Sequence, residues 1–411
     1  MIFAASGQTR KEPDIKRILK NEDLIVHFQQ VVYMTRKVVC GMEGLIRGFE
    51  GGTVVSPKAL FDAAIKKGLT LQLDRLCREK VLEAFGQIYP KNKDKLLFIN
   101  LDPSVLDQAK GNDYLIKQTQ KYGIHPSNIV VEINETKVLN SNALKEFIDR
   151  YRGAGFLLAL DDVGAGFSNL DRIPIVKPDI IKVDIALIRG IEADYHKQEV
   201  VKSLIRLATQ IGAMVVAEGV ETEQEAIETL RLGVNMIQGF YFSKPAALSA
   251  EPFANSRINM LADKYKQYVT EALRFEQRAY DKIALIAKKA LAELSGAENF
   301  DEQLRSVVGN HSAMECAYVL NENGLQCSDT VFGSGKCGAR DNLIFYSARP
   351  GADHSMKRYY FHVRNGKRDK YVTEPYVSLA TGNLCVTFAE VFKNAENKKF
   401  ILCMDFCTAE W

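Results

Sequence analysis

The stretch Phe156-Leu-Leu-Ala-Leu-Asp-Asp-Val-Gly-Ala-Gly-Phe-Ser-Asn-Leu170 decides how this chain is interpreted. An apolar run of strand length ends in two adjacent carboxylates, Asp161 and Asp162, and a glycine-rich loop follows them. Two acids at the end of a buried strand are costly unless a cation neutralises them. Adjacent carboxylates can each hold a metal ion or share one between them. An acidic turn that faces water explains the same stretch equally well, so the rest of the chain must decide.

The bulk properties are those of a globular protein with more than one domain. A length of 411 residues favours two domains, and a hydrophobic content of 46% with 26% charged residues is ordinary. The net charge of only +3 argues against a polymeric nucleic-acid partner, which would need a basic stripe. No apolar run is long enough to cross a membrane, and residues 1–7 make a poor signal peptide. We therefore expect a cytoplasmic protein without membrane insertion, whose eight cysteines are reduced and mostly buried.

Strand-like and helical segments alternate over about 230 residues. Strands are expected at 24–32, 38–46, 96–101, 129–133, 156–160, 180–184, 213–218 and 236–243. Helices are expected at 12–22, from Ser56 to about 85, near 103–122, and at 141–153, 195–211 and 222–233. Continuous apolar strands that alternate with helices indicate an α/β fold with a parallel sheet. The number of repeats favours a closed, TIM-like (β/α)8 barrel, in which chemistry gathers at the carboxyl ends of the strands.

Polar side chains follow these strand ends repeatedly: Glu43, Asn100, Glu132, Asp161, Asp162, Lys182, Glu218 and Gln238. Five carboxylates with amides and no histidine favour Mg²⁺ or Mn²⁺ over zinc or copper. Two ions about 3.5–4 Å apart would use this many acids and suit in-line displacement at a phosphoester. Lys182 could orient or deprotonate a water molecule, and Arg47 could meet a phosphate oxygen bidentately. The residues alone therefore predict a two-metal phosphodiesterase or phosphatase and leave the substrate open.

From about residue 12 to 250 the chain resembles the EAL family of cyclic di-GMP phosphodiesterases. The resemblance rests on seven motifs in the family's order and spacing: Glu43-Gly44-Leu45 with Arg47, Ile99-Asn100-Leu101, Glu132-Ile-Asn-Glu135, Asp161-Asp162-Val163-Gly164-Ala165-Gly166, Lys182-Val-Asp184, Glu218-Gly-Val-Glu221, and Gln238-Gly-x-x-x-Ser-Lys-Pro245. Any one of these motifs alone would be weak, and together they are specific.

The resemblance implies a role for each matching residue. One Mg²⁺ or Mn²⁺ ion would be held by Glu43, Asn100, Glu132 and Asp161, and a second by Asp161 and Asp162, with Glu218 as a ligand or a partner of the base. Lys182 would contact the attacking water. Substrate-contacting positions would be Gln29, Leu45, Arg47, Asp184 and Gln238. Glu135 and Glu221 would support the site from outside the metal ligands. The implied reaction opens cyclic di-GMP to linear pGpG in a homodimer.

Two departures from the family pattern bear on activity. Gly44 replaces the alanine of the motif, which we expect to loosen the backbone beside Glu43. Val163 and Ala165 replace the usual phenylalanine and threonine in a loop that couples metal binding to dimer contacts in the family. A catalytically silent receptor for cyclic di-GMP is therefore the alternative to an active enzyme. A barrel phosphatase that acts on another ester is a third hypothesis. Every predicted metal ligand is kept, which favours the enzyme.

Residues 251–299 are predicted to form a helical connector between the barrel at 12–250 and a second domain at 300–411. Its apolar stripe has a/d-like spacing and suits either a dimerising helix or a helix that lies on its own domain: Leu261, Tyr265, Tyr268, Ala272, Phe275 and Ala279.

The second domain is expected to be an α+β sensor of PAS- or Cache-like type. Asn323-Gly324 reads as a turn, and alternation around Tyr359, Phe361 and Val363 predicts a half-buried strand. Strands are also expected at 384–392 and 399–406. An unknown small ligand could lie among Arg349, Arg358, Tyr360 and Tyr376, although solvated strand faces explain the same residues.

Overall fold

The structure is a computed structural model that describes residues 12–102, 113–134, 141–166, 170–249, 251–311, 313–333, 344–365 and 369–407. The chain forms two compact units that divide between Val269 and Thr270, inside helix α10 (Arg257–Ser295). The limits of a separate connector at 251 and 299 stay predictions.

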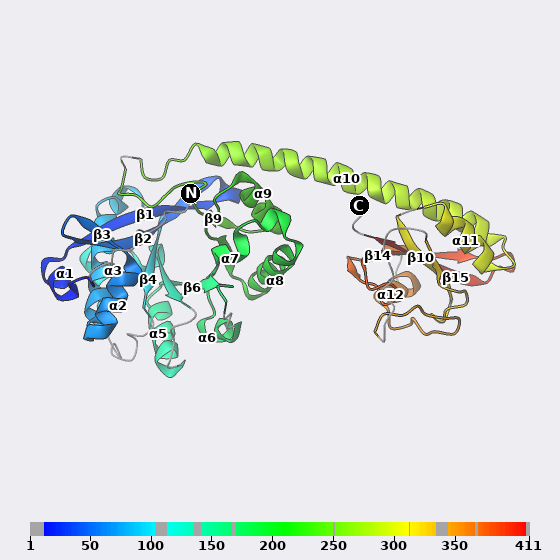
Figure 1. The fold of residues 1–411 in the computed structure, drawn as a ribbon, viewed down its shortest axis with the longest axis horizontal. Coiled ribbons are helices and arrows are strands. Elements are labelled where there is room, and N and C mark those ends of the chain that lie inside the picture. The colour runs from blue at the N-terminus through cyan, green and yellow to red at the C-terminus, as the bar shows by residue number, and fades with distance from the viewer. Residues whose placement is uncertain are drawn as a thin grey trace. The chain divides into compact units, whose positions relative to one another are not determined.

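The N-terminal unit is a closed barrel of eight strands, which confirms the predicted fold (Figure 1). Its strands are β1 (Leu24–Tyr33), β2 (Val38–Glu50), β4 (Leu96–Leu101), β5 (Ile129–Asn134), β6 (Leu157–Val163), β7 (Ile180–Val183), β8 (Met214–Ala217) and β9 (Met236–Gln238). A short strand β3 (Thr53–Val55) pairs with the far end of β2. The barrel closes because β1 pairs with both β2 and β9.

One strand departs from the predicted parallel sheet. β1 runs antiparallel to both of its neighbours, whereas β2 and β4 to β9 are parallel to one another. The reason is the short connection from β1 to β2, a single turn at Met34–Arg36 followed by Lys37 in the left-handed region. A parallel pair needs a crossover of a dozen or more residues, and this turn permits only a hairpin.

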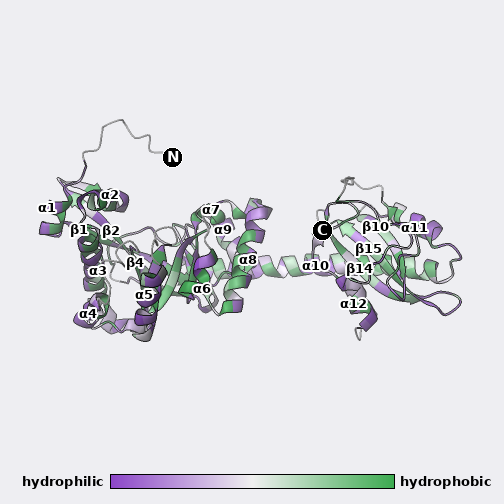
Figure 2. Ribbon diagram, turned by 90° about the horizontal axis from the view of Figure 1, so that it is seen from below, coloured by the Kyte–Doolittle hydropathy of each residue, from purple (hydrophilic) through white to green (hydrophobic). Residues whose placement is uncertain are grey.

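Helices surround the strands in Figure 1, and Figure 2 shows hydrophobic colouring along the central strands. The helices of this unit are α1 (Ile15–Asn21), α2 (Pro57–Lys67), α3 (Thr70–Gly86), α4 (Tyr114–Lys121), α5 (Ser141–Gly153), α6 (Ile173–Val176), α7 (Ile185–Ile188), α8 (Tyr195–Ile211) and α9 (Glu223–Leu232). Helix α9 begins with the predicted capping box, in which Thr222 and Glu225 exchange hydrogen bonds, and ends at Gly233 with φ of 102°.

The two faces of the strands bury different side chains. One buried residue from each of seven strands forms a layer inside the barrel: Val31, Phe98, Val130, Ala159, Ile180, Val216 and Met236. Their neighbours along the strands, such as Leu97 and Val131, belong to a separate cluster that packs against the helices. The inner layer is apolar, so it forms a dry floor beneath the carboxyl ends of the strands.

Two strand limits differ from the prediction by four residues or more. The last strand ends at Gln238 rather than at 243, because Gly239 crosses the backbone of Val220 and the chain then turns, with Ser243 N donating to Gly239 O at 3.1 Å. Strand β2 continues to Glu50, so Glu43 lies in the middle of a strand and not at its end.

Some predictions lie outside the described residues. These are the helical segment at 103–112, the second acid of the Glu-x-x-Glu motif at Glu135, and residues 167–169 of the glycine-rich loop.

The C-terminal unit has an antiparallel sheet in the order β11-β10-β15-β14-β12, with β13 also paired to β14. Its strands are β10 (Met314–Asn321), β11 (Val331–Phe332), β12 (Lys370–Val372), β13 (Tyr376–Val377), β14 (Leu384–Lys393) and β15 (Lys399–Cys407). Helix α11 (Phe300–Gly309) packs against β10, and α12 (Arg358–Asn365) packs against β14. The predicted strands at 384–392 and 399–406 are therefore present, and the unit is α+β.

The predicted strand around Tyr359 is wrong, since this segment is helix α12. Tyr359, Tyr360 and Val363 are the buried residues, and this i, i+1, i+4 spacing is helical rather than alternating. Tyr360 consequently points into the unit, where its hydroxyl donates to the backbone oxygen of Glu322 at 3.1 Å. The predicted turn at Asn323-Gly324 is present, with Gly324 at φ of 81°.

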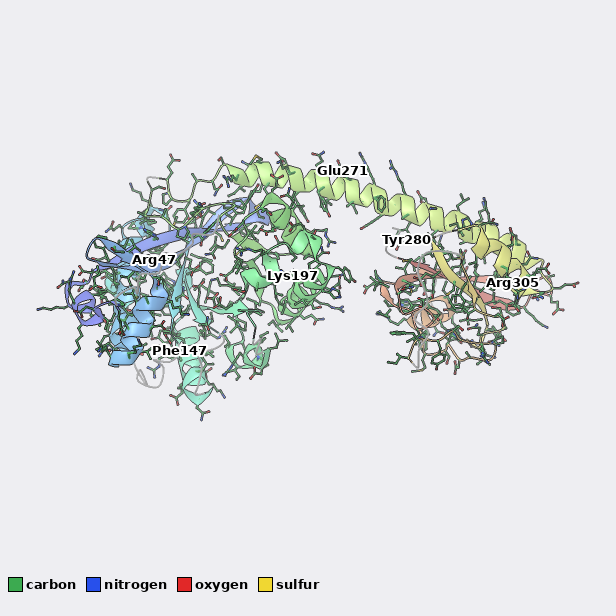
Figure 3. All side chains as sticks on the ribbon, in the orientation of Figure 1. Arg47, Phe147, Lys197, Glu271, Tyr280 and Arg305 are labelled. Carbon is green, nitrogen blue, oxygen red and sulfur yellow. The ribbon has the colours of Figure 1, made fainter. Side chains whose placement is uncertain are left out.

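Helix α10 is a single helix of 39 residues. Its first turns pack on the barrel through Leu261 and Tyr265, and its last turns join the core of the C-terminal unit through Ile286 and Leu294. Between these ends Phe275 and Tyr280 are exposed, and Figure 3 labels Glu271 and Tyr280 on this stretch. No helix among the described residues combines the length and the apolar character needed to cross a membrane.

Candidate functional site

Seven strands, and the residue directly after β8, each place one polar side chain in the layer directly above the apolar floor of the barrel: Gln29, Glu43, Asn100, Glu132, Asp161, Lys182, Glu218 and Gln238. Six of them lie two residues beyond a floor residue, as Glu132 follows Val130 and Lys182 follows Ile180. A period of two returns the side chain to the same face, so these groups must point inward. Because β1 runs the other way, Gln29 precedes Val31 by two, and it is paired in register with Glu43.

Lys182 lies at the centre of this layer. Its Nζ atom is 2.5 Å from Glu132 Oε1 and from Glu218 Oε1, 2.9 Å from Asp161 Oδ1 and 3.7 Å from Glu43 Oε2. The side chain of Lys182 is 1% exposed and that of Glu132 is fully buried. One ammonium group therefore faces four carboxylates in a region from which water is largely excluded.

The pKa values of the site show a shortage of positive charge. Burial alone would lower the pKa of Lys182, but the four surrounding carboxylates raise it well above its usual range. Burial, together with the charge of Glu43, raises the pKa of Glu132 well above its usual range. Burial raises the pKa of Glu218 to about 8, and burial followed by the charges of Asp161 and Asp184 raises the pKa of Asp162. The ring thus favours the binding of further positive charge.

A bulge in β6 explains how two consecutive acids serve one site. Strand alternation would send Asp161 and Asp162 to opposite faces of the sheet. The pairing of β6 with β7 shifts register between Leu160 and Val163, and Asp162 adopts a left-handed φ of 58°. The extra residue turns both carboxylates toward the same side. As a result Asp161, Asp162 and Glu218 bring ligand oxygens within 4.8 Å of one another.

Amide side chains hold Glu43 in place. Asn100 Nδ2 donates to Glu43 Oε1 at 2.8 Å, and Gln238 Nε2 donates to Glu43 Oε2 at 2.6 Å. Gln238 Nε2 also lies 3.3 Å from Gln29 Oε1, and Gln29 Nε2 donates to the backbone oxygen of Ser243 at 3.0 Å. Both oxygens of Glu43 are therefore oriented by side chains from other strands.

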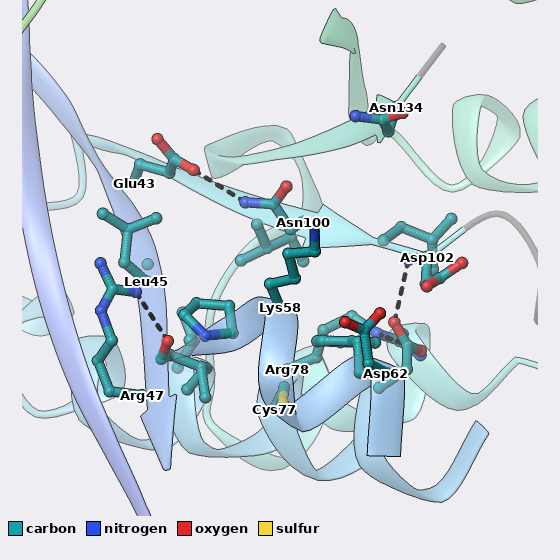
Figure 4. Close-up of a pocket in the computed structure, with 18 of the residues that line it drawn as sticks. Glu43, Leu45, Arg47, Lys58, Asp62, Cys77, Arg78, Asn100, Asp102 and Asn134 are labelled. Carbon is teal, nitrogen blue, oxygen red and sulfur yellow. Dashed lines mark hydrogen bonds and ion pairs between the residues drawn. The ribbon is translucent and has the colours of Figure 1, made fainter. Parts of the chain in front are cut away.

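A cavity of about 570 Å³ lies beside this layer, and Figure 4 shows the side chains that line it. Glu43 and Asn100 of the layer line the cavity, and so do the predicted substrate residues Leu45 and Arg47. The Arg47 guanidinium donates to the backbone oxygen of Ile46 at 2.8 Å. A volume of this size suits a small-molecule ligand rather than a single ion.

Sequence reasoning missed several residues of this cavity. Asn134 lines it and donates from Nδ2 to Asp162 Oδ2; its position two residues after Glu132 on β5 was the available signal. The buried ion pair between Arg78 and Asp74 on α3 also lines the cavity, and Asp74 Oδ1 accepts from the backbone N–H of Asp102 at 3.2 Å. An i, i+4 pair on a helix is usually a surface feature, so no sequence signal singled it out.

Gly44 has a packing role that the sequence did not indicate, while the expected loosening of the backbone beside Glu43 stays a prediction. A Cβ atom at this position would lie 2.2 Å from Val81 Cγ1, on helix α3. The glycine therefore lets a helix approach strand β2 closely beside Glu43. Gly219, next to Glu218, combines a φ of 65° with a Cβ position only 2.4 Å from Ile185 Cγ1.

Two predicted residues lie apart from the central layer. Asp184 accepts from Ala186 N at 2.8 Å and caps helix α7. Glu221 pairs with Arg189 at 3.1 Å, on a part of the surface where both side chains are well exposed. Glu135 lies outside the described residues.

The donor set fits divalent cations. Glu132 Oε2 is buried and has no hydrogen-bond partner among the described residues, and the layer with Asp162 holds five carboxylates against one lysine. Carboxylate and amide oxygens are the ligands that Mg²⁺, Mn²⁺ and Ca²⁺ prefer. Glu43, Asn100, Glu132, Asp161, Asp162 and Glu218 are the residues that would hold such ions.

Fold and site together define a class of protein, an α/β barrel with an acidic cation site at the carboxyl edge of its strands. Residues 12–245 match the EAL domain family, so the chain belongs to that family.

Two curated relatives show how far the similarity extends. The probable cyclic di-GMP phosphodiesterase PdeB of Escherichia coli (strain K12) is 30% identical over 236 residues, which cover 57% of this chain and 45% of PdeB. The chain thus spans less than half the length of that relative. The uncharacterized EAL-domain containing protein YkuI of Bacillus subtilis (strain 168) is 25% identical over 395 residues, which cover 90% of this chain and 92% of YkuI.

Solved structures agree with the fold. The crystal structure of Bacillus subtilis YkuI, in complex with substrate c-di-GMP and calcium, superposes with a TM-score of 0.79 and 23% identity, over 97% of this chain and 100% of that chain. At 23% identity this similarity is evidence for the fold only. A calcium and cy-diGMP complex of Klebsiella pneumoniae BlrP1 gives a TM-score of 0.51 with 31% identity, over 58% of each chain.

Proposed function

We propose that this protein is a phosphodiesterase that hydrolyses cyclic di-GMP to linear pGpG with two divalent ions, Mg²⁺ or Mn²⁺. The observation that carries the proposal is the buried layer around Lys182, in which four carboxylates lie within 3.7 Å of one ammonium group. The adjoining cavity with Arg47 on its wall gives a nucleotide phosphate room beside that layer. Relatives named as cyclic di-GMP phosphodiesterases, such as PdeB, support the choice of substrate.

Bound divalent ions would supply an acidified water molecule and neutralise phosphate charge. Side chains of the protein orient the water molecule and handle its proton. Lys182 holds the attacking water against the carboxylates, and Glu218, whose Oε1 lies 2.5 Å from the ammonium group, receives or relays its proton. Asn100 and Gln238 fix Glu43, so that its two oxygens present a defined geometry.

Three further elements belong to the proposal. Leu45, Gln29 and Gln238 contact the guanine bases or waters beside them, Arg47 binds a phosphate oxygen, and Asp184 contacts the substrate. Glu135 and Glu221 support the site indirectly. The protein acts as a homodimer in the cytoplasm, and its C-terminal unit regulates hydrolysis.

The test is the conversion of cyclic di-GMP by the purified full chain in Mg²⁺ or Mn²⁺, with pGpG followed by chromatography and binding measured in parallel in Ca²⁺. Glu43→Gln and Asp161→Asn should abolish turnover, whereas Glu199→Gln, a matched change on the exposed face of α8, should not. Binding in Ca²⁺ without any product would identify a receptor instead. Turnover that survives in both site variants would contradict the proposed metal ligands.

A further inference from the structure

A second cavity, of about 720 Å³, lies wholly within the C-terminal unit. Tyr318, Tyr359, His354 and Asp405 form its deep part and are all at least nine-tenths buried. Arg349 and Tyr376 line it as well, as the sequence suggested, whereas Arg358 and Tyr360 do not. Its volume is within the usual range for small-molecule sites, about 300–1,000 Å³.

The direction of the hydrogen bonds in the cavity wall follows from one glutamine. Gln326 Nε2 lies 2.9 Å from the backbone oxygen of Ser328, which can only accept, so its Oε1 must be the acceptor for His354 Nε2 at 3.0 Å. A neutral His354 then has Nδ1 as its acceptor, and the hydroxyl of Tyr359 donates to it at 2.9 Å. Tyr318 must in turn donate to Tyr359, at 2.8 Å.

The hydrogen bonds on the opposite wall of the cavity also have a fixed direction. Thr387 Oγ1 donates to the carboxylate of Asp405 at 2.7 Å, so it must accept from the hydroxyl of Tyr376 at 2.6 Å. The phenol protons of Tyr318 and Tyr376 are therefore both used inside the protein. Each of these two oxygens keeps only lone pairs for a further partner.

The deep end of the cavity consequently offers acceptors without donors. Asp405 is 2% exposed, its oxygens accept from Thr387 and from the weak donor Cys316 at 3.6 Å, and no basic side chain among the described residues forms an ion pair with it. A buried carboxylate without a cation is costly, and a ligand that carries several N–H groups and a positive charge would remove that cost.

The opening has the reverse polarity. Among the described residues that line it, Arg349 is exposed and Lys357 is partly exposed, and Asp353 is the exposed carboxylate, which accepts from Ser355 N at 2.7 Å. The rim therefore favours a negative group, while the deep end favours a positive one.

We propose that this cavity binds a zwitterion of the amino-acid class, with its ammonium group against Asp405, Tyr318 and Tyr376 and its carboxylate toward Arg349. The rings of Tyr318 and Tyr376 at the deep end and the exposed ring of Tyr346 also line the cavity and suit an apolar or aromatic side chain. The site is separate from the carboxylate layer of the barrel, and its occupancy does not depend on hydrolysis of cyclic di-GMP.

The experiment screens the standard L-amino acids one by one, at about 1 mM, against the full chain by thermal unfolding, and measures each positive by calorimetry. At least one amino acid should bind, and the matching carboxylic acid without the amine should bind at least about tenfold more weakly, because it leaves Asp405 without a cation. An amide in place of the ligand carboxylate should weaken binding several-fold through Arg349.

Asp405→Asn gives the sharpest test, because it removes the negative charge at nearly constant volume. Ligand affinity should fall at least about tenfold while the ligand-free protein unfolds at the same or a higher temperature, so that lost folding cannot explain the result. Tyr376→Phe should weaken binding several-fold, and Glu396→Gln, on an exposed turn of the same unit, should leave it unchanged. Binding of no amino acid, equal binding of the acid without the amine, or full affinity in Asp405→Asn would each overturn the proposal.

Discussion

The close approach of helix α3 to strand β2 can be tested by restoring the alanine of the family motif at Gly44. A Cβ atom there would lie 2.2 Å from Val81 Cγ1, 2.9 Å from Cγ2 and 3.2 Å from Cβ. Carbon atoms in contact normally sit about 3.5–4.0 Å apart. Val81 is only 2% exposed and is packed in the main core, so it has little room to withdraw. Gly44→Ala must therefore move α3 or the segment of β2 that carries Glu43.

The expected loss of stability can be worked out for each of the two single variants and for the double variant. Overpacking of this kind costs about 1–3 kcal/mol in free energy of unfolding. Val81→Ala removes two buried methyl groups, at about 0.8 kcal/mol each before the cavity is counted, and should cost about 2 kcal/mol. In the double variant the new methyl group occupies the space that Val81 has left. The combined loss should be smaller than the sum of the two by at least about 1 kcal/mol.

The assay is urea unfolding of the full chain, with turnover of cyclic di-GMP measured in the same preparations. Gly44→Ala should lower both stability and turnover, because Glu43 is the next residue, and Val81→Ala in the same chain should restore part of each. Gly153→Ala is the matched control, since no heavy atom lies within 4 Å of its Cβ position. Additive costs for Gly44→Ala and Val81→Ala would refute the reasoning, because they would show that Val81 is not the obstacle.

Three further predictions follow from buried charges. Lys182→Met leaves the fully buried Glu132 without its cation, so it should destabilise the metal-free barrel by about 3–5 kcal/mol, and Mn²⁺ should recover part of the loss in thermal unfolding with and without chelator. Asp74→Ala leaves Arg78 buried and uncompensated, so the free energy of unfolding should fall by a similar amount. It should also weaken nucleotide binding, because both residues line the cavity. Unchanged stability would mean that the pair is solvated. Burial raises the pKa of Asp405 to about 6 from its ordinary 3.8, so the native state binds more protons than the unfolded state between these values and loses stability as pH rises through them. Asp405→Asn should therefore gain up to about 3 kcal/mol over the parent above pH 6 and nothing below about pH 4, as measured by denaturation across that range.

Much of the barrel could be predicted because each strand and helix carries its own local signal. Apolar runs of strand length, a capping hydroxyl at Ser56 and the box formed by Thr222 and Glu225 all act within a few residues. The direction of β1 carries a local signal too, in the short turn to β2, but the pattern of a parallel sheet outweighed it. Helix α12 was missed because an amphipathic helix of eight residues and an alternating strand share several apolar positions.

The residues of the candidate site that follow a repeated sequence pattern could be predicted. Polar residues two positions beyond apolar ones on successive strands mark an inward layer, and Glu132 and Lys182 were found in this way. The partners that lie on other elements were not. Asn134 acts on Asp162 because of a bulge, and Val81 constrains Gly44 from a helix, so both depend on distances that no local pattern encodes.

The position of Lys182 links the stability of the barrel to its chemistry. Directly below the lysine lies the layer of apolar side chains, which carries no charge that could neutralise the carboxylates from beneath. Lys182 must therefore compensate Glu132, Glu218 and Asp161 together, at 2.5–2.9 Å, and these contacts fix its ammonium group in one place. A side chain held so firmly by three acids is a structural counterion. It becomes available to hold a water molecule only when other cations share the charge of the ring, because only then can it leave one carboxylate without stranding a buried anion. The same imbalance that makes the layer costly in the metal-free protein thus makes its chemistry dependent on the ions it would bind.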